Sequence, residues 1–102
     1  MFSPCILVID DDVNLLVKLE AVLKQAGYRV LTANNGRQGI YLAEAALPEV
    51  IVGDVTDDFG VRSTLAQDSQ TASIPFVFLT KPLDESELVA NINAVIRSQP
   101  VR

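Results

Sequence analysis

Histidine and tryptophan are absent from the 102 residues, cysteine occurs once, and only eight residues are lysine or arginine. Without histidine, the chain lacks the most common general base and metal ligand, so any chemistry must come from carboxylates, hydroxyls or lysine. The single Cys5 excludes an internal disulfide and is typical of a reducing cytosol. No apolar stretch is long enough to span a membrane, and a net charge of −5 argues against binding to nucleic acid. We therefore expect a cytoplasmic domain that binds neither membranes nor nucleic acid.

The residues that are present have the composition of a folded domain, with 49% hydrophobic and 21% charged residues. Strands are predicted at Cys5–Ile9, Tyr28–Ala33, Val50–Gly53 and Ile74–Leu79. Helices are predicted from the Asp10–Asp12 triplet to about Ala26, from the turn Asn34–Gly36 to near Leu47–Pro48, over Val61–Asp68 and from Asp84 onwards, with a polar loop at Ser69–Thr71. The alternation predicts a parallel sheet with helices on both faces. We expect one domain over residues 1–98 and a tail or linker at 99–102.

Polar residues follow three of the predicted strands. Asp10 and Asp11 end the first strand, Asp54 the third, and Thr80 and Lys81 the fourth. In such folds the carboxyl ends of the strands meet at one edge, where functional residues gather. Carboxylates brought together repel each other unless a cation joins them, and hard oxygen ligands suit Mg²⁺. An aspartate can accept a phosphoryl group, and a hydroxyl and an ammonium can stabilise its oxygens. The pattern therefore indicates phosphoryl transfer at this edge.

Four segments resemble a known family when taken together and in order: ILVIDDD, PEVIVGD, IPFVFLT and KPLDESEL. They resemble the receiver domain of response regulators in two-component signalling, and the resemblance covers residues 5–98. It implies a flavodoxin-like, three-layer α/β fold. It also implies that a histidine kinase or a phosphotransfer protein transfers a phosphoryl group to Asp54. Thr80 would be the switch hydroxyl and Lys81 the phosphoryl-contacting lysine.

The same resemblance implies a set of ligands for the cofactor, Mg²⁺. The ion would be held by Asp11, Asp54 and the backbone carbonyl of Thr56, with Asp10 acting mainly through water. A protein of this kind is not an enzyme acting on separate substrates. At most it phosphorylates and dephosphorylates itself.

The sequence departs from the family most clearly at Thr80 and Lys81, which are adjacent. In the family a helix and a strand separate the switch hydroxyl from the lysine, a segment of roughly 20 to 30 residues. Without them, the resemblance implies a parallel sheet reduced to four strands in the order 2-1-3-4, with about four helices. The loop Val55–Gly60 is also shorter than usual and contains two additional acids, Asp57 and Asp58.

Loss of the fifth strand would leave the strand at Ile74–Leu79 on the edge of the sheet. This segment is apolar, carries no charge and is protected only at its start by Pro75, so it can pair with another chain. We therefore expect a homodimer through Ile74–Leu79. A competing possibility is that the last helix packs over the sheet surface that the missing helix would have covered.

The sequence is compatible with three functions. Successive strand residues point to opposite faces, so adjacent Thr80 and Lys81 cannot both be placed as in the family. The chain is thus either a phosphoacceptor receiver or a non-phosphorylated pseudo-receiver that mediates dimerisation or protein interaction. The third function, that of a phosphohydrolase, rests on a weaker resemblance to haloacid-dehalogenase phosphatases, with Asp10 as nucleophile and Asp12 as acid/base, although Asn14 departs from that motif.

Several of these residues also have plain structural interpretations. The Asp10–Asp12 triplet has the pattern of a helix cap. Cys5, Phe76 and Phe78 have the pattern of ordinary packing residues.

Overall fold

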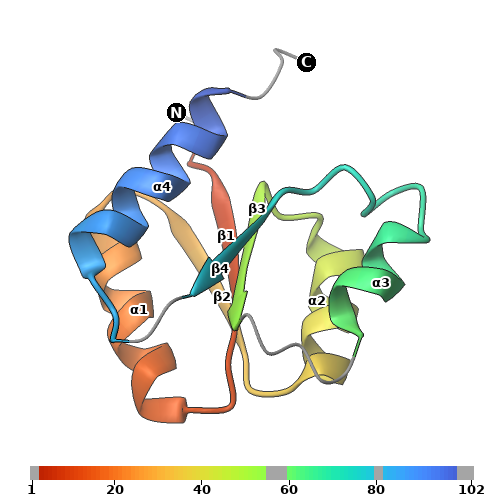
Figure 1. The fold of residues 1–102 in the computed structure, drawn as a ribbon, viewed down its shortest axis with the longest axis horizontal. Coiled ribbons are helices and arrows are strands. Elements are labelled where there is room, and N and C mark those ends of the chain that lie inside the picture. The colour runs from red at the N-terminus through yellow and green to blue at the C-terminus, as the bar shows by residue number, and fades with distance from the viewer. Residues whose placement is uncertain (1–2, 55–59, 80–81, 99–102) are drawn as a thin grey trace.

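The computed structural model describes residues 3–54, 60–79 and 82–98, except for the side chain of Asp54 (Figure 1). Strands and helices alternate strictly along the described chain. The strands are β1 (Cys5–Ile9), β2 (Arg29–Ala33), β3 (Val50–Asp54) and β4 (Phe76–Leu79). The helices are α1 (Val13–Gln25), α2 (Gly36–Ala46), α3 (Val61–Ala66) and α4 (Glu85–Arg97). The predicted order of elements is confirmed.

The strands form one parallel sheet in the order β2-β1-β3-β4, as expected for a receiver-like fold without its fifth strand. Figure 1 shows α1 and α4 on one side of the sheet and α2 and α3 on the other. This is the expected three-layer arrangement. Within the described residues, β2 and β4 are the two edges, and no described element lies in front of β4 in Figure 1.

Local signals in the sequence explain where the helices begin and end. The Asn35 side chain accepts a hydrogen bond from the Gln38 N–H (2.8 Å) at the start of α2. Asp84 accepts one from the Glu87 N–H (3.1 Å) at the start of α4. Both are N-caps that satisfy a backbone donor of the first turn. Gly27 follows α1 at a φ of +98°, a left-handed conformation that glycine adopts without steric cost.

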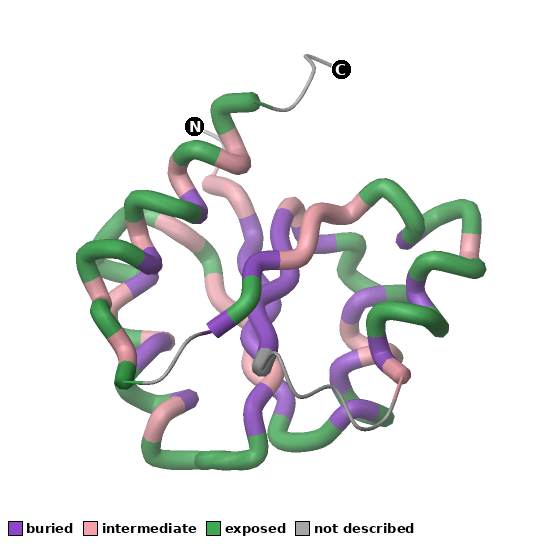
Figure 2. The backbone as a smooth tube through the Cα atoms, in the orientation of Figure 1, coloured by how far each residue is buried: buried purple, intermediate pink, exposed green. Residues whose placement is uncertain are grey.

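Apolar side chains form a core on each face of the sheet. The core beside α1 and α4 contains Ile6, Val8, Leu19, Val77 and Ile92, among others. The core beside α2 and α3 contains Leu7, Ala33, Ala43, Ile51, Val61 and Leu65. Figure 2 shows the buried positions concentrated along the two central strands, β1 and β3. Burial of both faces explains the continuous apolar runs by which these strands were predicted.

Cys5 belongs to the buried part of β1 and is 7% exposed. Burial raises the pKa of its thiol, and this outweighs the opposite effect of the charge on Arg29. The interpretation of Cys5 as a packing residue is confirmed. None of the described helices is long and apolar enough to cross a membrane.

The last helix does not cover the sheet surface beside α3. Leu88 and Ile92 of α4 pack in the core that faces α1, together with Val77 and Leu79 of β4. Phe78 points to the opposite face, because strand residues alternate, and is 37% exposed. The competing possibility that the last helix takes the place of the missing one is therefore wrong for this face.

Two details of the segment before β4 differ from the prediction. Regular strand structure begins at Phe76 rather than Ile74, because the Ile74 N–H donates to Thr71 O (3.1 Å) and proline at 75 has no N–H. Thr71 was placed in a polar loop, yet it is 2% exposed. Its hydroxyl donates a hydrogen bond to Leu65 O (2.6 Å). That bond satisfies the buried hydroxyl and ties the segment to α3.

Candidate functional site

The register of the sheet brings the predicted site residues to one edge. Ile9 of β1 pairs with Gly53 of β3, so Asp10 and Asp54 leave the sheet at the same level on adjacent strands. Adjacent strands lie about 4.8 Å apart. Asp54 in turn pairs with Leu79, the last residue of β4. The two residues that follow, Thr80 and Lys81, lie outside the described residues, as does Thr56.

Asp10 is a buried carboxylate, with 4% of its surface exposed. Its N–H donates to Ala33 O (3.1 Å), which holds it beside β2. Its Oδ1 accepts a hydrogen bond from the Asp12 N–H (2.9 Å). Burying a charged carboxylate is costly unless hydrogen bonds or a cation compensate for the lost water. Asp10 is thus held firmly at the carboxyl end of β1, unlike a side chain in a solvated turn.

The two aspartates that follow Asp10 differ from each other. Asp12 is the N-cap of α1, and its Oδ1 accepts a hydrogen bond from the Leu15 N–H (3.2 Å). The helix-cap interpretation is therefore confirmed for Asp12. Asp11 is exposed and precedes the cap. The triplet thus divides into a buried acid, an exposed acid and a structural cap.

The donor set fits Mg²⁺. Asp10 and Asp11 supply carboxylate oxygens directly after β1, and Asp54 ends the neighbouring strand β3. Oxygen ligands are those that Mg²⁺ prefers. Among the described side chains, no three or more acidic, histidine or cysteine residues lie close enough together to hold a metal. The Asp54 side chain lies outside the described part of the structure.

Substitutions at Asp11 and Asp12 should separate the expected role of Asp11 as a Mg²⁺ ligand from the role of Asp12 as a helix cap. Asp12→Ala removes the acceptor for the Leu15 N–H, and we expect the free energy of unfolding to fall by about 1 kcal/mol while Mg²⁺ affinity is retained. Asp11→Ala should weaken Mg²⁺ binding by about tenfold or more. In the absence of Mg²⁺ it should change the free energy of unfolding by less than about 0.5 kcal/mol.

Urea unfolding without Mg²⁺ and calorimetric titration with Mg²⁺ measure the two quantities. Equal effects of both substitutions on Mg²⁺ affinity would argue against this division of roles.

A second group of side chains lies on the α3 face of β4. The Arg62 guanidinium carbon lies 4.8 Å from the ring centroid of Phe78 and 5.9 Å from that of Phe76. The two ring centroids are 5.3 Å apart. The Phe76 ring also approaches Gly53, where a Cβ atom would lie 2.8 Å from its Cζ. Aromatic and cation–π contacts of this kind hold Arg62 across the strand.

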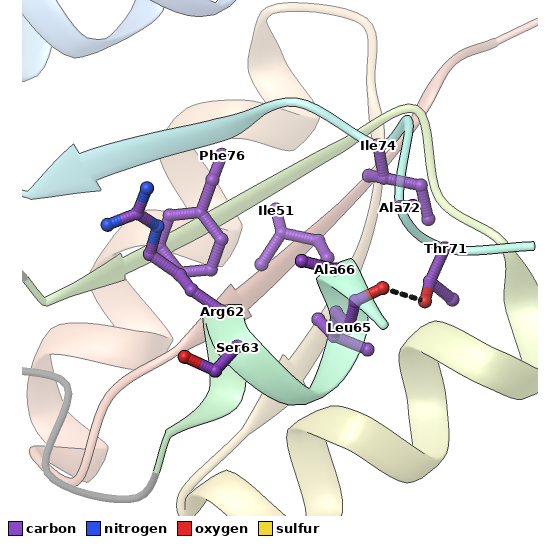
Figure 3. A pocket seen from close by; sticks show the side chains of 9 residues that line it. All are labelled: Ile51, Arg62, Ser63, Leu65, Ala66, Thr71, Ala72, Ile74 and Phe76. Atoms are coloured by element: carbon purple, nitrogen blue, oxygen red, sulfur yellow. Dashed lines mark hydrogen bonds between the residues drawn. The ribbon is translucent and has the colours of Figure 1, made fainter. Parts of the chain in front are cut away.

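A pocket of about 450 Å³ adjoins this group (Figure 3). It is lined by Ile51, Arg62, Ser63, Leu65, Ala66, Thr71, Ala72, Ile74 and Phe76. Neither the pocket nor the position of Arg62 was predicted. The aromatic residues were correctly interpreted as packing groups, but no spacing in the sequence links Arg62 in α3 to residues of β4, because the contact depends on how α3 lies on the sheet.

The strand order and the acidic carboxyl edge define a doubly wound α/β protein of the receiver type. No protein-family model matches the chain. Protein PilH of Pseudomonas aeruginosa is 32% identical, over 89% of this chain and 96% of PilH. The DNA-binding dual master transcriptional regulator RpaA of Synechocystis is also 32% identical, over 92% of this chain. The chain spans only 49% of the length of RpaA.

The chain belongs to the response-regulator receiver family of two-component signalling. Its fold resembles that of the receiver domain of the sensor histidine kinase PA1611 from Pseudomonas aeruginosa, whose structure has a magnesium ion in the active-site cleft. The TM-score is 0.85 at 21% identity, over 95% of this chain and 100% of that domain.

The alignment with PilH also gives the number of positions that this chain lacks. It extends over 116 positions, whereas 89% of this 102-residue chain is about 91 residues, so about 25 positions of PilH have no counterpart here. This agrees with the size expected for a helix, a strand and their loops.

Proposed function

We propose that this receiver domain accepts a phosphoryl group on Asp54 with the help of Mg²⁺ and signals through altered self-association or partner binding. The observation that supports this most is the buried carboxylate of Asp10, held at the carboxyl end of β1 at the same level as Asp54 on β3. A folded domain keeps a buried acid at such a place only where its charge is compensated. The proposal includes a cytoplasmic location and a histidine kinase or phosphotransfer protein as donor.

In the proposed reaction a carboxylate oxygen of Asp54 attacks the phosphorus of the donor. A P–O bond to Asp54 forms while the bond between phosphorus and the donor breaks, and the donor leaves with its electron pair. Bound Mg²⁺, held by Asp11, Asp54, the Thr56 carbonyl and, through water, Asp10, would neutralise charge on the phosphoryl oxygens. Lys81 would contact the same oxygens, and Thr80 would respond to the modification. The domain would modify itself once and would not turn over a separate substrate.

The proposed self-association is a homodimer through the segment Ile74–Leu79, of which Phe76–Leu79 forms β4. The register links this segment to the site, because Asp54 pairs directly with Leu79. A phosphoryl group on Asp54 would therefore lie one strand away from the dimerising edge. Modification of Asp54 could therefore change the conformation of β4 through a direct neighbour.

The second candidate is a pseudo-receiver that dimerises or binds partners without being phosphorylated. It is favoured by the short connection between β4 and α4, which places Thr80 and Lys81 next to each other. A third candidate, an aspartate-based phosphohydrolase, would need Asp12 as acid/base. The Asp12 carboxylate instead caps α1, which makes this candidate the weakest.

Treatment of the purified protein with acetyl phosphate separates these candidates. With Mg²⁺ present we expect one acid-stable, base-labile phosphoryl group per chain by intact mass spectrometry. When EDTA replaces Mg²⁺ during the reaction, we expect none. A chain that binds Mg²⁺ by calorimetry but takes up no phosphoryl group would support the pseudo-receiver. Continuous release of phosphate from phosphate esters would support the phosphohydrolase.

A further inference from the structure

The outer edge of β4 presents backbone groups that can bind another strand. The Ile51 N–H of β3 donates to Pro75 O (3.0 Å), so the Pro75 carbonyl points towards β3. Backbone groups of alternate residues in a strand point to opposite sides. The N–H and C=O groups of Phe76 and Phe78 therefore point away from β3. Within the described residues nothing pairs with them, because β4 ends the sheet.

The side chains of this strand make an open edge unfavourable. Phe78 is 37% exposed, and the strand carries no charged residue that would discourage pairing. In the relative PilH, about 25 additional positions provide chain that this protein lacks. The edge that a fifth strand would cover is therefore open within the described residues.

We infer that β4 pairs with β4 of a second copy in an antiparallel arrangement, with each Phe76 opposite Phe78 of the other copy. This inference rests on the proposed self-association and specifies its geometry. Within β4 as described, Phe76 and Phe78 point their N–H and C=O groups outward, and of the antiparallel registers this one pairs all of these groups on both copies. A shift towards Ile74 would compete for the N–H that already donates to Thr71 O (3.1 Å).

The occupant is a second copy because the edge is complementary to itself. A two-fold axis beside Val77 places the same strand opposite itself, as symmetric dimers require. Phe76 and Phe78 of each copy then lie on one face, so that each phenylalanine faces another across the strands, a favourable pairing. Arg62 of each copy already lies over these rings (4.8 and 5.9 Å). The result is a sheet that continues from one chain into the other.

Disulfide formation tests the register. In the proposed pairing Val77 lies opposite Val77 of the second copy in a non-hydrogen-bonded pair, with Cα atoms about 4.5 Å apart, which is within disulfide range. In a Cys5→Ala background, Val77→Cys should form a disulfide-linked dimer under mild oxidation. Phe78→Cys is the matched control. Two copies of residue 78 would be displaced by about 7 Å along the strands, so it should link far more slowly.

The control is demanding because residue 78 is the more exposed position, at 37% against 9% for Val77. Random collision would therefore link Phe78→Cys first. Faster linking of Phe78→Cys than of Val77→Cys would overturn the proposed register.

Sedimentation velocity supplies a second measurement that does not need cysteine variants. Phe78→Lys puts a charge on the edge and should raise the dimer dissociation constant by about tenfold or more. Tyr41→Lys, which removes an aromatic side chain 68% exposed on α2, should leave it unchanged. Circular dichroism checks that both variants fold.

The outcomes distinguish this inference from the broader proposal. A wild-type monomer at high micromolar concentration would overturn both. The pairing of β4 would be overturned, with self-association left intact, by three results together: the wild type dimerises, the Phe78→Lys variant dimerises equally well, and the Val77→Cys variant forms no disulfide.

Discussion

In the Asp54→Asn variant, acetyl phosphate and Mg²⁺ are expected to leave no phosphoryl group above background, whereas the wild-type chain carries one. The amide lacks the anionic oxygen that attacks phosphorus, and it removes one of the three acids proposed to surround Mg²⁺. Asp54 is the residue that ends β3 and is proposed as the sole acceptor, so we expect the loss to be complete rather than partial. Intact mass spectrometry measures the modified fraction directly.

Asp58→Asn is the matched control for this substitution. It makes the same chemical change in the acidic segment that follows Asp54, and it should retain the phosphoryl group. Equal labelling of Asp54→Asn and the wild type would place the acceptor elsewhere. Loss of labelling in both variants would indicate a general effect of removing an acid from this part of the sequence.

Ile92→Ala should lower the free energy of unfolding by about 3 kcal/mol. Ile92 is fully buried in α4, in the core shared with Leu19 and Val77. The substitution removes apolar contacts and leaves a cavity under the helix. The Lys18–Glu85 ion pair between α1 and α4 (3.6 Å) is exposed and cannot compensate for such a loss.

The neighbouring Asn91→Ala, on the exposed side of α4, should change the free energy of unfolding by less than about 0.5 kcal/mol. Urea unfolding followed by circular dichroism measures both variants. A loss below about 1 kcal/mol for Ile92→Ala would mean that α4 contributes little to the core. Such a result would contradict the packing of α4 against β4 and α1.

The sequence predicted those parts of the fold that depend on local signals. The apolar run of β1, the cap at Asp84 and the glycine after α1 each act within a few residues, and each lies where it was predicted. The adjacency of Thr80 and Lys81 predicted the four-stranded order, because it removed the place for a fifth strand. At the site, the burial of Asp10 follows from its position after a central strand.

Features that depend on packing between distant segments were not predictable in the same way. The burial of Thr71 depends on a carbonyl of α3 that accepts its hydrogen bond. The place of Arg62 over Phe78 depends on how a short helix lies on the sheet. The start of β4 depends on a turn that uses the Ile74 N–H. Apolar periodicity contains no information on these three contacts.

Without a fifth strand, the edge that we propose to dimerise is the strand next to Asp54. Asp54 and Leu79 are direct partners between β3 and β4, and β4 is an edge of the sheet within the described residues. A fifth strand would cover that edge. Here a change at Asp54 lies beside the strand that is proposed to bind a second copy. Coupling between phosphorylation and dimerisation is therefore the central claim.

Sedimentation velocity of the unmodified and the phosphorylated wild-type chain tests this coupling most directly. Both samples are measured over the same concentration series, with Mg²⁺ present and the modified fraction checked by mass spectrometry. We predict a dimer whose dissociation constant differs between the two samples. Identical dissociation constants in the two samples, or a monomer in both, would contradict the coupling of Asp54 to the β4 edge.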